Sequence, residues 1–235
     1  MEKGVTVVMG AGPGLGSALA HRFARGGQEV AVMARDGSRL ESLCRGIEDE
    51  GGKAEAVEVD VTNPEAVSTA FDTVRKRLGE VSALIYNAGA FRVEGLMETT
   101  PEDFLKSWQV NCFGAFLAIR QVIPSMMERG GGSILLTSAT AALRGSARFA
   151  CLAVGKFGLR ALAQSTAREF GPKGVHVAHF IIDGLIDTDR VRGMFPSAET
   201  KLHPVAIAET YWQVHKQPRS AWTLEMDLRP AAESF

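Results

Sequence analysis

A glycine-rich segment near the start of the chain has the composition of a turn that binds a diphosphate. It reads Gly10-Ala11-Gly12-Pro13-Gly14-Leu15-Gly16, follows an apolar run at residues 5–9 and precedes apolar side chains at helical spacing. Glycines let the backbone turn tightly and bring its N–H groups close to a diphosphate, which also faces the positive end of the helix dipole. The alternative is a tight strand-to-helix turn that binds no ligand.

A second polar signal, Arg35, follows the next apolar run at residues 29–34. A dinucleotide-binding fold that prefers NAD usually ends this strand with an acid for the ribose 2′-hydroxyl, whereas NADP is met by an Arg at the 2′-phosphate. Ala34 takes the place of the acid here, and the guanidinium of Arg35 can bind a phosphate bidentately. We therefore predict NADP as the cofactor, with NAD less favoured. Alternatively, Arg35 is a solvated surface residue, or Asp36 pairs with it or accepts from a ribose hydroxyl.

The elements that must position these residues alternate between strand and helix. The expected strands cover residues 5–9, 29–34, 54–59, 83–86, 133–137, 175–181 and 222–228. The expected helices start at about residues 15, 38 and 64 and cover about 100–127, 149–170 and 204–217. Repeated strand–helix–strand units predict a parallel sheet with helices on both faces, which binds ligands at the carboxyl ends of its strands, near the point where strand order reverses.

Composition bounds the remaining possibilities. The chain has 235 residues, 46% of them apolar, and a doubly wound sheet commonly uses this length as one domain, so we expect a single α/β domain over residues 1–235. The 26 basic and 27 acidic residues give a net charge of −1, which does not suggest a nucleic-acid partner. Cys44, Cys112 and Cys151 lack metal-ligand spacing, which predicts reduced thiols and no metal site. We expect no signal peptide, no membrane-spanning segment and a cytoplasmic location.

Polar residues and glycines follow the expected strands at their carboxyl ends. They are Asp60-Val61 after the third strand, Asn87-Ala88-Gly89 after the fourth, Ser138 after the fifth, and Gly184, Ile186 and Thr188 after the sixth, with Asn111 and Lys156 in the two long helices. Together with the glycine turn, the order and spacing of these motifs resemble the short-chain dehydrogenase/reductase family from residue 5 to the last strand. The resemblance implies a Rossmann-type, doubly wound, mainly parallel sheet, a nicotinamide cofactor and a small-molecule substrate.

The resemblance also implies which residues hold the cofactor and which perform chemistry. The cofactor-binding set would be Gly10, Gly14, Leu15, Gly16, Arg35, Asp60, Val61, Asn87, Ala88, Gly89, Lys156, Gly184, Ile186 and Thr188, and the catalytic set would be Asn111, Ser138 and Lys156. In the family, Asp60 and Val61 would contact the adenine, and Thr188 would touch the nicotinamide end. Taken alone, Asp60 and Asn87 could instead serve as turn residues.

The chain departs from the family at the position of its catalytic tyrosine. That tyrosine lies four residues before the lysine, on the same helix face, and the residue four before Lys156 is Leu152. Leucine has no proton to give, and losing a positioned general acid costs roughly 10² to 10⁴ in rate. Tyr86 and Tyr211 offer no obvious substitute. The dienoyl-CoA reductases of the family, which also lack this tyrosine and keep the lysine, are similar in this respect.

A second departure follows the sixth strand, where Asp183-Gly184 stands in place of the family's usual Pro-Gly. The Asp183 carboxylate could approach the nicotinamide or a substrate, but we favour a cap on the following turn. Residues 190–203, which would cover the pocket in the family, have mixed polarity and indicate no particular substrate.

Two functions fit these observations. The first is an NADP-dependent oxidoreductase that reduces a carbonyl or an activated C=C bond of a small molecule with non-standard proton delivery. The alternative is a catalytically weak or inactive NADP-binding sensor or scaffold, and we favour the enzyme. The two long helices carry more apolar side chains than one narrow stripe needs, which predicts a homodimer or, more strongly, a homotetramer.

Overall fold

Strands and helices alternate along the chain in the order that the apolar pattern predicts. The computed structural model describes residues 4–198 and 200–232; residue 199 and both ends of the expected domain, residues 1–3 and 233–235, lie outside the described residues. The strands are β1 (Val5–Met9), β2 (Glu29–Ala34), β3 (Lys53–Glu58), β4 (Val81–Tyr86), β5 (Gly132–Ala139), β6 (Val175–Ile182) and β7 (Glu225–Leu228). The helices are α1 (Leu15–Arg25), α2 (Gly37–Asp49), α3 (Pro64–Arg77), α4 (Pro101–Trp108), α5 (Gly114–Glu128), α6 (Ala150–Phe170), α7 (Asp189–Met194) and α8 (Pro204–His215).

The strands form one sheet in the order β3-β2-β1-β4-β5-β6-β7, and every neighbouring pair is parallel. Strand order reverses between β1 and β4, which pair directly from Thr6 opposite Ala83 to Met9 opposite Tyr86. The glycine turn after β1 and the polar residues after β4 therefore meet at the reversal point, where doubly wound sheets bind ligands. The predicted fold class is confirmed.

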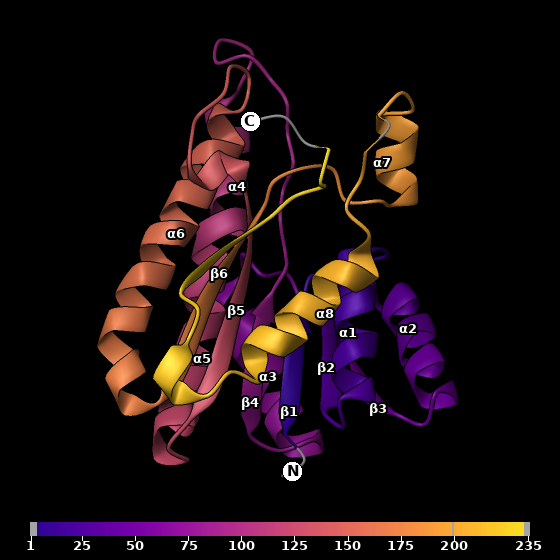
Figure 1. The fold of residues 1–235 in the computed structure, drawn as a ribbon, viewed down its shortest axis with the longest axis vertical. Coiled ribbons are helices and arrows are strands. Elements are labelled where there is room, and N and C mark those ends of the chain that lie inside the picture. The colour runs from indigo at the N-terminus through magenta and orange to yellow at the C-terminus, as the bar shows by residue number, and fades with distance from the viewer. Residues whose placement is uncertain (1–3, 199, 233–235) are drawn as a thin grey trace.

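Helices cover both faces of the sheet, and each face has its own apolar core. On one face, α1, α2 and α8 bury side chains such as Leu19, Leu40 and Tyr211 against the strands, and α8 crosses in front of the sheet beside α1 (Figure 1). On the other face, α3, α5 and α6 bury side chains such as Phe71 and Leu159. Because both faces are covered, the central strands are apolar on both sides, as parallel strands usually are.

The long helix expected at about residues 100–127 is interrupted by a π-helical turn, Gln109–Phe113, between α4 and α5. Thr100 starts the helical stretch by accepting a hydrogen bond from the backbone N–H of Asp103 over 3.1 Å. The π turn carries Asn111, whose side chain is fully buried. Single π turns inside helices often occur at functional sites.

This helical stretch also has the dimensions of a membrane span. Residues Pro101–Glu128 are long and apolar enough to cross a membrane by length and composition alone. Half of the most apolar window is buried inside the protein. Since α5 contributes the fully buried Ala118 and Val122 to the core beneath the sheet, we assign the stretch as a core helix.

The C-terminal part differs locally from the expected pattern. The last strand starts at Glu225 instead of residue 222, and a 3₁₀ turn at Arg219–Ala221 precedes it. Helix α7 was not expected; it starts after Thr188, whose hydroxyl accepts from the backbone N–H of Val191 over 3.2 Å. It stands apart from the sheet near the carboxyl ends of the strands (Figure 1) and buries no side chain, so no apolar period predicts it.

Candidate active site

The glycine turn between β1 and α1 packs directly against the end of β4. Gly10 has a φ of 85°, and a Cβ atom there would lie 2.5 Å from the backbone nitrogen of Ala88. Asn87 reaches back across the turn, since its side-chain amide donates to the carbonyl oxygen of Gly10 over 2.9 Å. A Cβ atom on Gly16 would lie 2.3 Å from that same oxygen. These residues build the turn, whereas Gly12 has open space around it.

The N-terminus of α1 offers backbone donors to an anion. The first N–H groups of a helix have no acceptor within the helix, and α1 follows Gly14 (φ 106°) with no side-chain cap. Helix α2, by contrast, begins with a cap from Asp36. The N–H groups of Leu15 and Gly16 and the positive end of the helix dipole are therefore suited to a diphosphate.

The segment after β6 returns to this helix terminus. A Cβ atom on Gly14 would lie 2.4 Å from Cγ2 of Thr188, the residue that caps α7. Gly184 has a φ of 143°, and Ile186 forms an isolated parallel bridge with Leu202. The structure thus places the predicted residues after β6 beside the predicted residues after β1.

Arg35 is an exposed cation at the carboxyl end of β2. Its guanidinium makes no hydrogen bond or ion pair with any residue that the structure describes. Asp36 is not its partner, because that carboxylate accepts from the Ser38 hydroxyl over 2.8 Å and pairs with Arg39 at 3.0 Å. Arg35 is therefore available to a ligand at the edge of the sheet.

Asp60, which follows β3, stabilises a turn through one of its carboxylate oxygens. Its Oδ1 accepts from the backbone N–H of Thr62 over 2.9 Å and from the Thr62 hydroxyl over 2.8 Å. These hydrogen bonds, helped by the positive charges of Arg35 and Lys106, hold the pKa of Asp60 below its usual range. Asp60 thus performs the turn chemistry that its type allows, and the adenine contact of Asp60 and the buried Val61 stays a prediction.

A cavity of about 350 Å³, which we call the reaction cavity, opens at the ends of β4, β5 and β6. The predicted site residues in its lining are Leu15, Asn87, Gly89, Asn111, Ser138, Lys156, Gly184 and Ile186. The predicted residues outside its lining are Gly10, Gly14, Gly16, Arg35, Asp60, Val61, Ala88 and Thr188. The structure therefore brings all three candidate catalytic side chains to one cavity beside the glycine turn.

Ser138 and Lys156 are buried polar residues in this lining. Ser138 is 4% exposed, and within the described ranges its hydroxyl has no hydrogen-bond partner. Such a group is uncommon, because leaving it unpaired costs about 1–3 kcal/mol. Lys156 donates from Nζ to the carbonyl oxygen of Thr137 over 3.0 Å, and burial lowers its pKa to about 8. Its ammonium has three donors, so two remain for a ligand.

Asn111 is held rigidly by the backbone around it. Its Nδ2 donates to the carbonyl oxygens of Ala90 and Ser107, each over 3.0 Å, and its Oδ1 accepts from the backbone N–H of Ala90 over 3.3 Å. Gly155 of α6 makes room for it, since a Cβ atom there would lie 2.6 Å from Cβ of Asn111. The π turn therefore fixes Asn111 between the loop after β4 and α6.

Leu152 faces the reaction cavity from the first turn of α6 and is 6% exposed. Both tyrosines use their hydroxyls elsewhere. Tyr86 donates to the carbonyl oxygen of Val110 over 2.6 Å. Tyr211 donates to Oγ1 of Thr137 over 2.9 Å. Burial raises the pKa of both phenols, and neither tyrosine lines this cavity.

A second cavity, of about 520 Å³, adjoins the reaction cavity and shares Phe91, Leu152 and Phe195 with it. We call it the outer cavity. Asp183 lies in its wall, where its carboxylate accepts from the Thr140 hydroxyl and pairs with Arg229 at 3.4 Å. This carboxylate therefore joins the loop after β5 to the segment after β7, instead of capping the turn that follows it.

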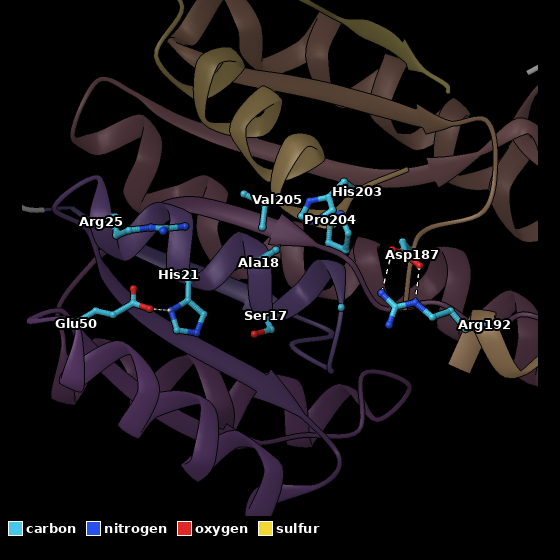
Figure 2. A pocket seen from close by; sticks show the side chains of 11 residues that line it. Ser17, Ala18, His21, Arg25, Glu50, Asp187, Arg192, His203, Pro204 and Val205 are labelled. Atoms are coloured by element: carbon cyan, nitrogen blue, oxygen red, sulfur yellow. Dashed lines mark hydrogen bonds and ion pairs between the residues drawn. The ribbon is translucent and has the colours of Figure 1, made fainter. Parts of the chain in front are cut away.

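A third cavity, of about 340 Å³, lies on the outer side of α1 and shares no lining residue with the other two. Figure 2 shows two pairs among its side chains: His21 lies 3.2 Å from Glu50, and Arg192 lies 2.8 Å from Asp187. Gly14 is the predicted site residue in its lining. We place no chemistry in this cavity, because none of the candidate catalytic residues lines it.

Sequence reasoning missed Phe91, which lines the reaction cavity from the loop after β4, where no apolar period or motif identifies it. Arg190 and Phe195 line the same cavity and belong to residues 190–203, the segment that the family resemblance expects to cover the pocket. Within residues 4–198 and 200–232, no group of three or more His, Cys, Asp or Glu side chains could hold a metal ion.

Comparison with known proteins places this arrangement in one family. The short chain dehydrogenase family matches residues 4–199. A short-chain dehydrogenase/reductase of Armillaria gallica is 34% identical over 179 residues, which are 75% of this chain and 69% of the relative. The crystal structure of a short-chain dehydrogenase from Rhodopseudomonas palustris is 38% identical, has a TM-score of 0.85, and covers 97% of this chain and 98% of its own.

A further solved structure is the NADPH-bound short chain oxidoreductase from Pseudomonas aeruginosa PAO1, which contains an atypical catalytic center. It is 25% identical, has a TM-score of 0.89, and covers 99% of this chain and 97% of its own. This chain belongs to the short-chain dehydrogenase family, because the family matches most of its length and the structure has the parallel sheet and the glycine turn.

Proposed function

We propose that this protein is an NADP(H)-dependent oxidoreductase that reduces a carbonyl group, or an activated C=C bond, of a small molecule. One observation carries the proposal: the buried Ser138 hydroxyl, which has no partner among the described residues, lines the same cavity as the Lys156 ammonium, beside the uncapped start of α1. Reduction adds a hydride and a proton to the substrate, and NADPH supplies the hydride when it is bound.

The residues present fit NADP(H). The backbone donors of α1 suit the pyrophosphate, and Arg35, with Ala34 in the place of an acid, suits the 2′-phosphate. The NADPH in the Pseudomonas aeruginosa relative supports this choice over NAD. Lys156 has free donors for the nicotinamide ribose hydroxyls. The other residues that we assign to the cofactor are Gly10, Gly14, Leu15 and Gly16 in the turn, Asp60 and Val61 at the adenine, Asn87, Ala88 and Gly89 beside it, and Gly184, Ile186 and Thr188 toward the nicotinamide.

We infer that Leu152 occupies the position of the family's catalytic tyrosine. It lies one helical turn before Lys156 and lines the cavity that Ser138 also lines. Ser138 can donate its hydroxyl to a substrate carbonyl oxygen, and Asn111 keeps the π turn in place and could anchor a water. The ammonium of Lys156 is charged at pH 7 and, with a pKa of about 8, gives up a proton more readily than an exposed lysine. Lys156, directly or through a water, is therefore the proton source that we assign.

The experiment that tests this function measures NADPH oxidation by the purified protein with a panel of aldehydes, ketones and enoyl thioesters. We expect turnover of at least one compound, a loss of about 10²-fold or more in Ser138→Ala or Lys156→Met, and no loss in Ser165→Ala, an exposed serine on α6. NADPH oxidation that is unchanged in both Ser138→Ala and Lys156→Met would contradict the assigned site.

A catalytically weak or inactive NADP-binding sensor or scaffold is the second candidate. It is favoured by Leu152, because the residue that we infer to replace the acid is apolar while the nucleotide-binding residues are kept. Calorimetric titration that detects tight NADPH binding, together with no turnover of any compound in the panel, would select this candidate over the enzyme.

We also propose that the protein is cytoplasmic and assembles as a homodimer or homotetramer. Helices α4, α5 and α6 expose large apolar side chains in the single chain: Leu105 is 52% exposed, Phe116 38%, Val154 45% and Phe157 44%. Apolar patches of this kind are stabilised by contact with another copy. Light scattering at micromolar concentration is expected to give twice or four times the chain mass of 25.2 kDa, and a monomer would overturn the proposal.

A further inference from the structure

The outer cavity, whose lining does not include Ser138, combines apolar side chains with a few polar and charged ones. Its lining includes the aromatic rings of Phe91, Phe149 and Phe195 and the aliphatic side chains of Leu152 and Leu185. At about 520 Å³, it is larger than the reaction cavity, with which it shares part of this lining. A cavity of this size and composition suits the apolar body of a small molecule whose reacting end lies at Ser138.

The ionisable side chains in the lining of the two cavities are mostly cationic. They are Arg144 and Asp183 in the outer cavity and Lys156 and Arg190 in the reaction cavity. The single carboxylate among them, that of Asp183, lies 3.4 Å from Arg229, which also pairs with Asp227, so three cations stand against one carboxylate in the two linings. The excess positive charge favours an anionic ligand over a neutral or cationic one.

Arg144 is the cation at the rim of the outer cavity. Its guanidinium makes no hydrogen bond or ion pair within the described part of the chain. Other arginines in the neighbouring loops are paired: Arg148 lies 3.4 Å from Glu98, and Arg92 lies 2.5 Å from Asp103. The backbone N–H of Arg144 donates to the carbonyl oxygen of Thr140 over 3.2 Å, which anchors the residue to the turn that follows β5.

We propose that the substrate is an amphipathic molecule with an oxyanion, a carboxylate or a phosphate, at the end remote from its reacting group. Arg144 binds the oxyanion at the rim, and the apolar body lies against Phe149 and Phe195 in the outer cavity. A guanidinium is suited to this role because its two parallel N–H donors match the two oxygens of such a group. The proposal rests on the proposed function, since the reacting group lies at Ser138.

Binding of non-reacting compounds tests the proposal without turnover. Octanoate, octyl phosphate and octanamide are titrated by calorimetry into the protein with and without NADP. We expect at least one of the two anions to bind about tenfold more tightly than octanamide, and the tighter anion identifies the oxyanion as carboxylate or phosphate. Arg144→Gln is expected to remove the preference, and the matched variant Arg148→Gln, in the same loop but outside both linings, is expected to keep it.

The outcomes separate this inference from the proposed function. Equal binding of octanamide and both anions, or a preference that survives in a folded Arg144→Gln protein, would overturn the role of Arg144. A preference lost in Arg190→Gln but kept in Arg144→Gln would do the same. Reduction of neutral carbonyl compounds with NADPH would meanwhile leave the proposed function standing. Circular dichroism of each variant verifies the fold, and Arg144→Lys, which keeps the charge, should retain part of the preference.

Discussion

The candidate site, which extends from the glycine turn to the reaction cavity, has two walls that hold their residues in different ways. One is built from the glycine turn, α1 and the end of β4, where backbone packs on backbone: a Cβ atom on Gly10 or Gly16 would lie 2.5 Å or less from a main-chain atom. The other is built from β5 and α6, where Ser138, Leu152 and Lys156 project as side chains from regular elements. We infer that the second wall departs from the family pattern at Leu152, whereas Gly10, Gly14 and Gly16 of the first wall resemble the family's glycine motif.

We infer that this difference favours a departure at position 152 over one in the glycine turn. A side chain added at Gly10 displaces the main chain of the loop after β4 and so disturbs the whole turn. A tyrosine or a leucine at position 152 leaves the backbone of α6 unchanged, because either residue fits a helix. We therefore expect that substitutions can change nucleotide binding and proton delivery independently in this fold.

The largest expected effect is a gain of activity in Leu152→Tyr. A phenol at this position would lie on the face of α6 that carries Lys156, close to Ser138, and would supply the acid that we infer to be missing. We expect NADPH-dependent carbonyl reduction to increase by up to about 10² to 10⁴. Leu152→Phe, which adds the same ring without the hydroxyl, is the control and should not gain. If a Leu152→Tyr protein folds and binds NADPH but reduces no carbonyl faster than its parent, then nucleotide binding and proton delivery do not change independently.

Removing the guanidinium of Arg35, at the edge of the sheet, should weaken the binding of the nucleotide alone. In Arg35→Ala we expect NADPH to bind about 10- to 100-fold more weakly, because a charge-assisted contact with the 2′-phosphate is lost. NADH affinity should not change, and neither should NADPH affinity in Arg45→Ala, an exposed arginine of α2. Calorimetry with both cofactors measures these affinities. Equal affinity of the parent protein for NADPH and NADH would contradict the assignment.

The buried ammonium of Lys156 should lower the free energy of unfolding of the protein. Its pKa is about 8 in the folded protein and higher when the chain unfolds, so the unfolded state holds more protons between these values and stability rises with pH there. At pH 7 the full cost is present, and Lys156→Met should raise the free energy of unfolding by about 1–3 kcal/mol while weakening NADPH binding. Urea denaturation from pH 7 to 10 measures this. A Lys156→Met protein less stable than its parent would indicate a structural role for the ammonium.

The smallest expected effect concerns His179 of β6, the strand that pairs with β5. His179 pairs in register with Leu136 of β5, is fully buried, and has a pKa lowered to about 4 by burial, which outweighs the attraction of Glu225 at 3.7 Å. Since the unfolded chain takes up this proton below about pH 6.5, stability should fall as pH falls from there toward 4, by about 2 kcal/mol at pH 5. His179→Phe should lessen the fall, as measured by urea denaturation. His203→Ala, at an exposed position, should not.

The parallel sheet and most helices could be predicted because their apolar periods are long and regular, whereas the order of the strands comes from the structure. The π turn could not, since one extra residue between α4 and α5 leaves the apolar pattern almost unchanged. Helix α7 could not either, because its start depends on the Thr188 cap and not on buried side chains. We did not note from the sequence that Pro101–Glu128 is long and apolar enough to span a membrane. The core helix of a protein can be as apolar as a membrane-spanning helix.

The candidate site could be predicted in its members but not in its contacts. The glycine turn, Ser138 and Lys156 were identified by type and spacing, and the structure brings them to one edge of the sheet. Their cofactor and catalytic roles stay predictions. The ion pair of Asp183 with Arg229 joins positions far apart in the chain, and the free hydroxyl of Ser138 depends on packing from several segments. Neither can be derived from a local pattern.

The contact between Gly14 and Thr188 makes two distant positions depend on each other in evolution. A Cβ atom on Gly14 would lie 2.4 Å from Cγ2 of Thr188, and a φ of 106° adds strain of its own. Serine at position 188 lacks that methyl group but keeps the hydroxyl that starts α7. Among descendants of this sequence, an alanine at position 14 should therefore arise on a serine background at position 188, and the double change should cost less than the sum of the two single changes.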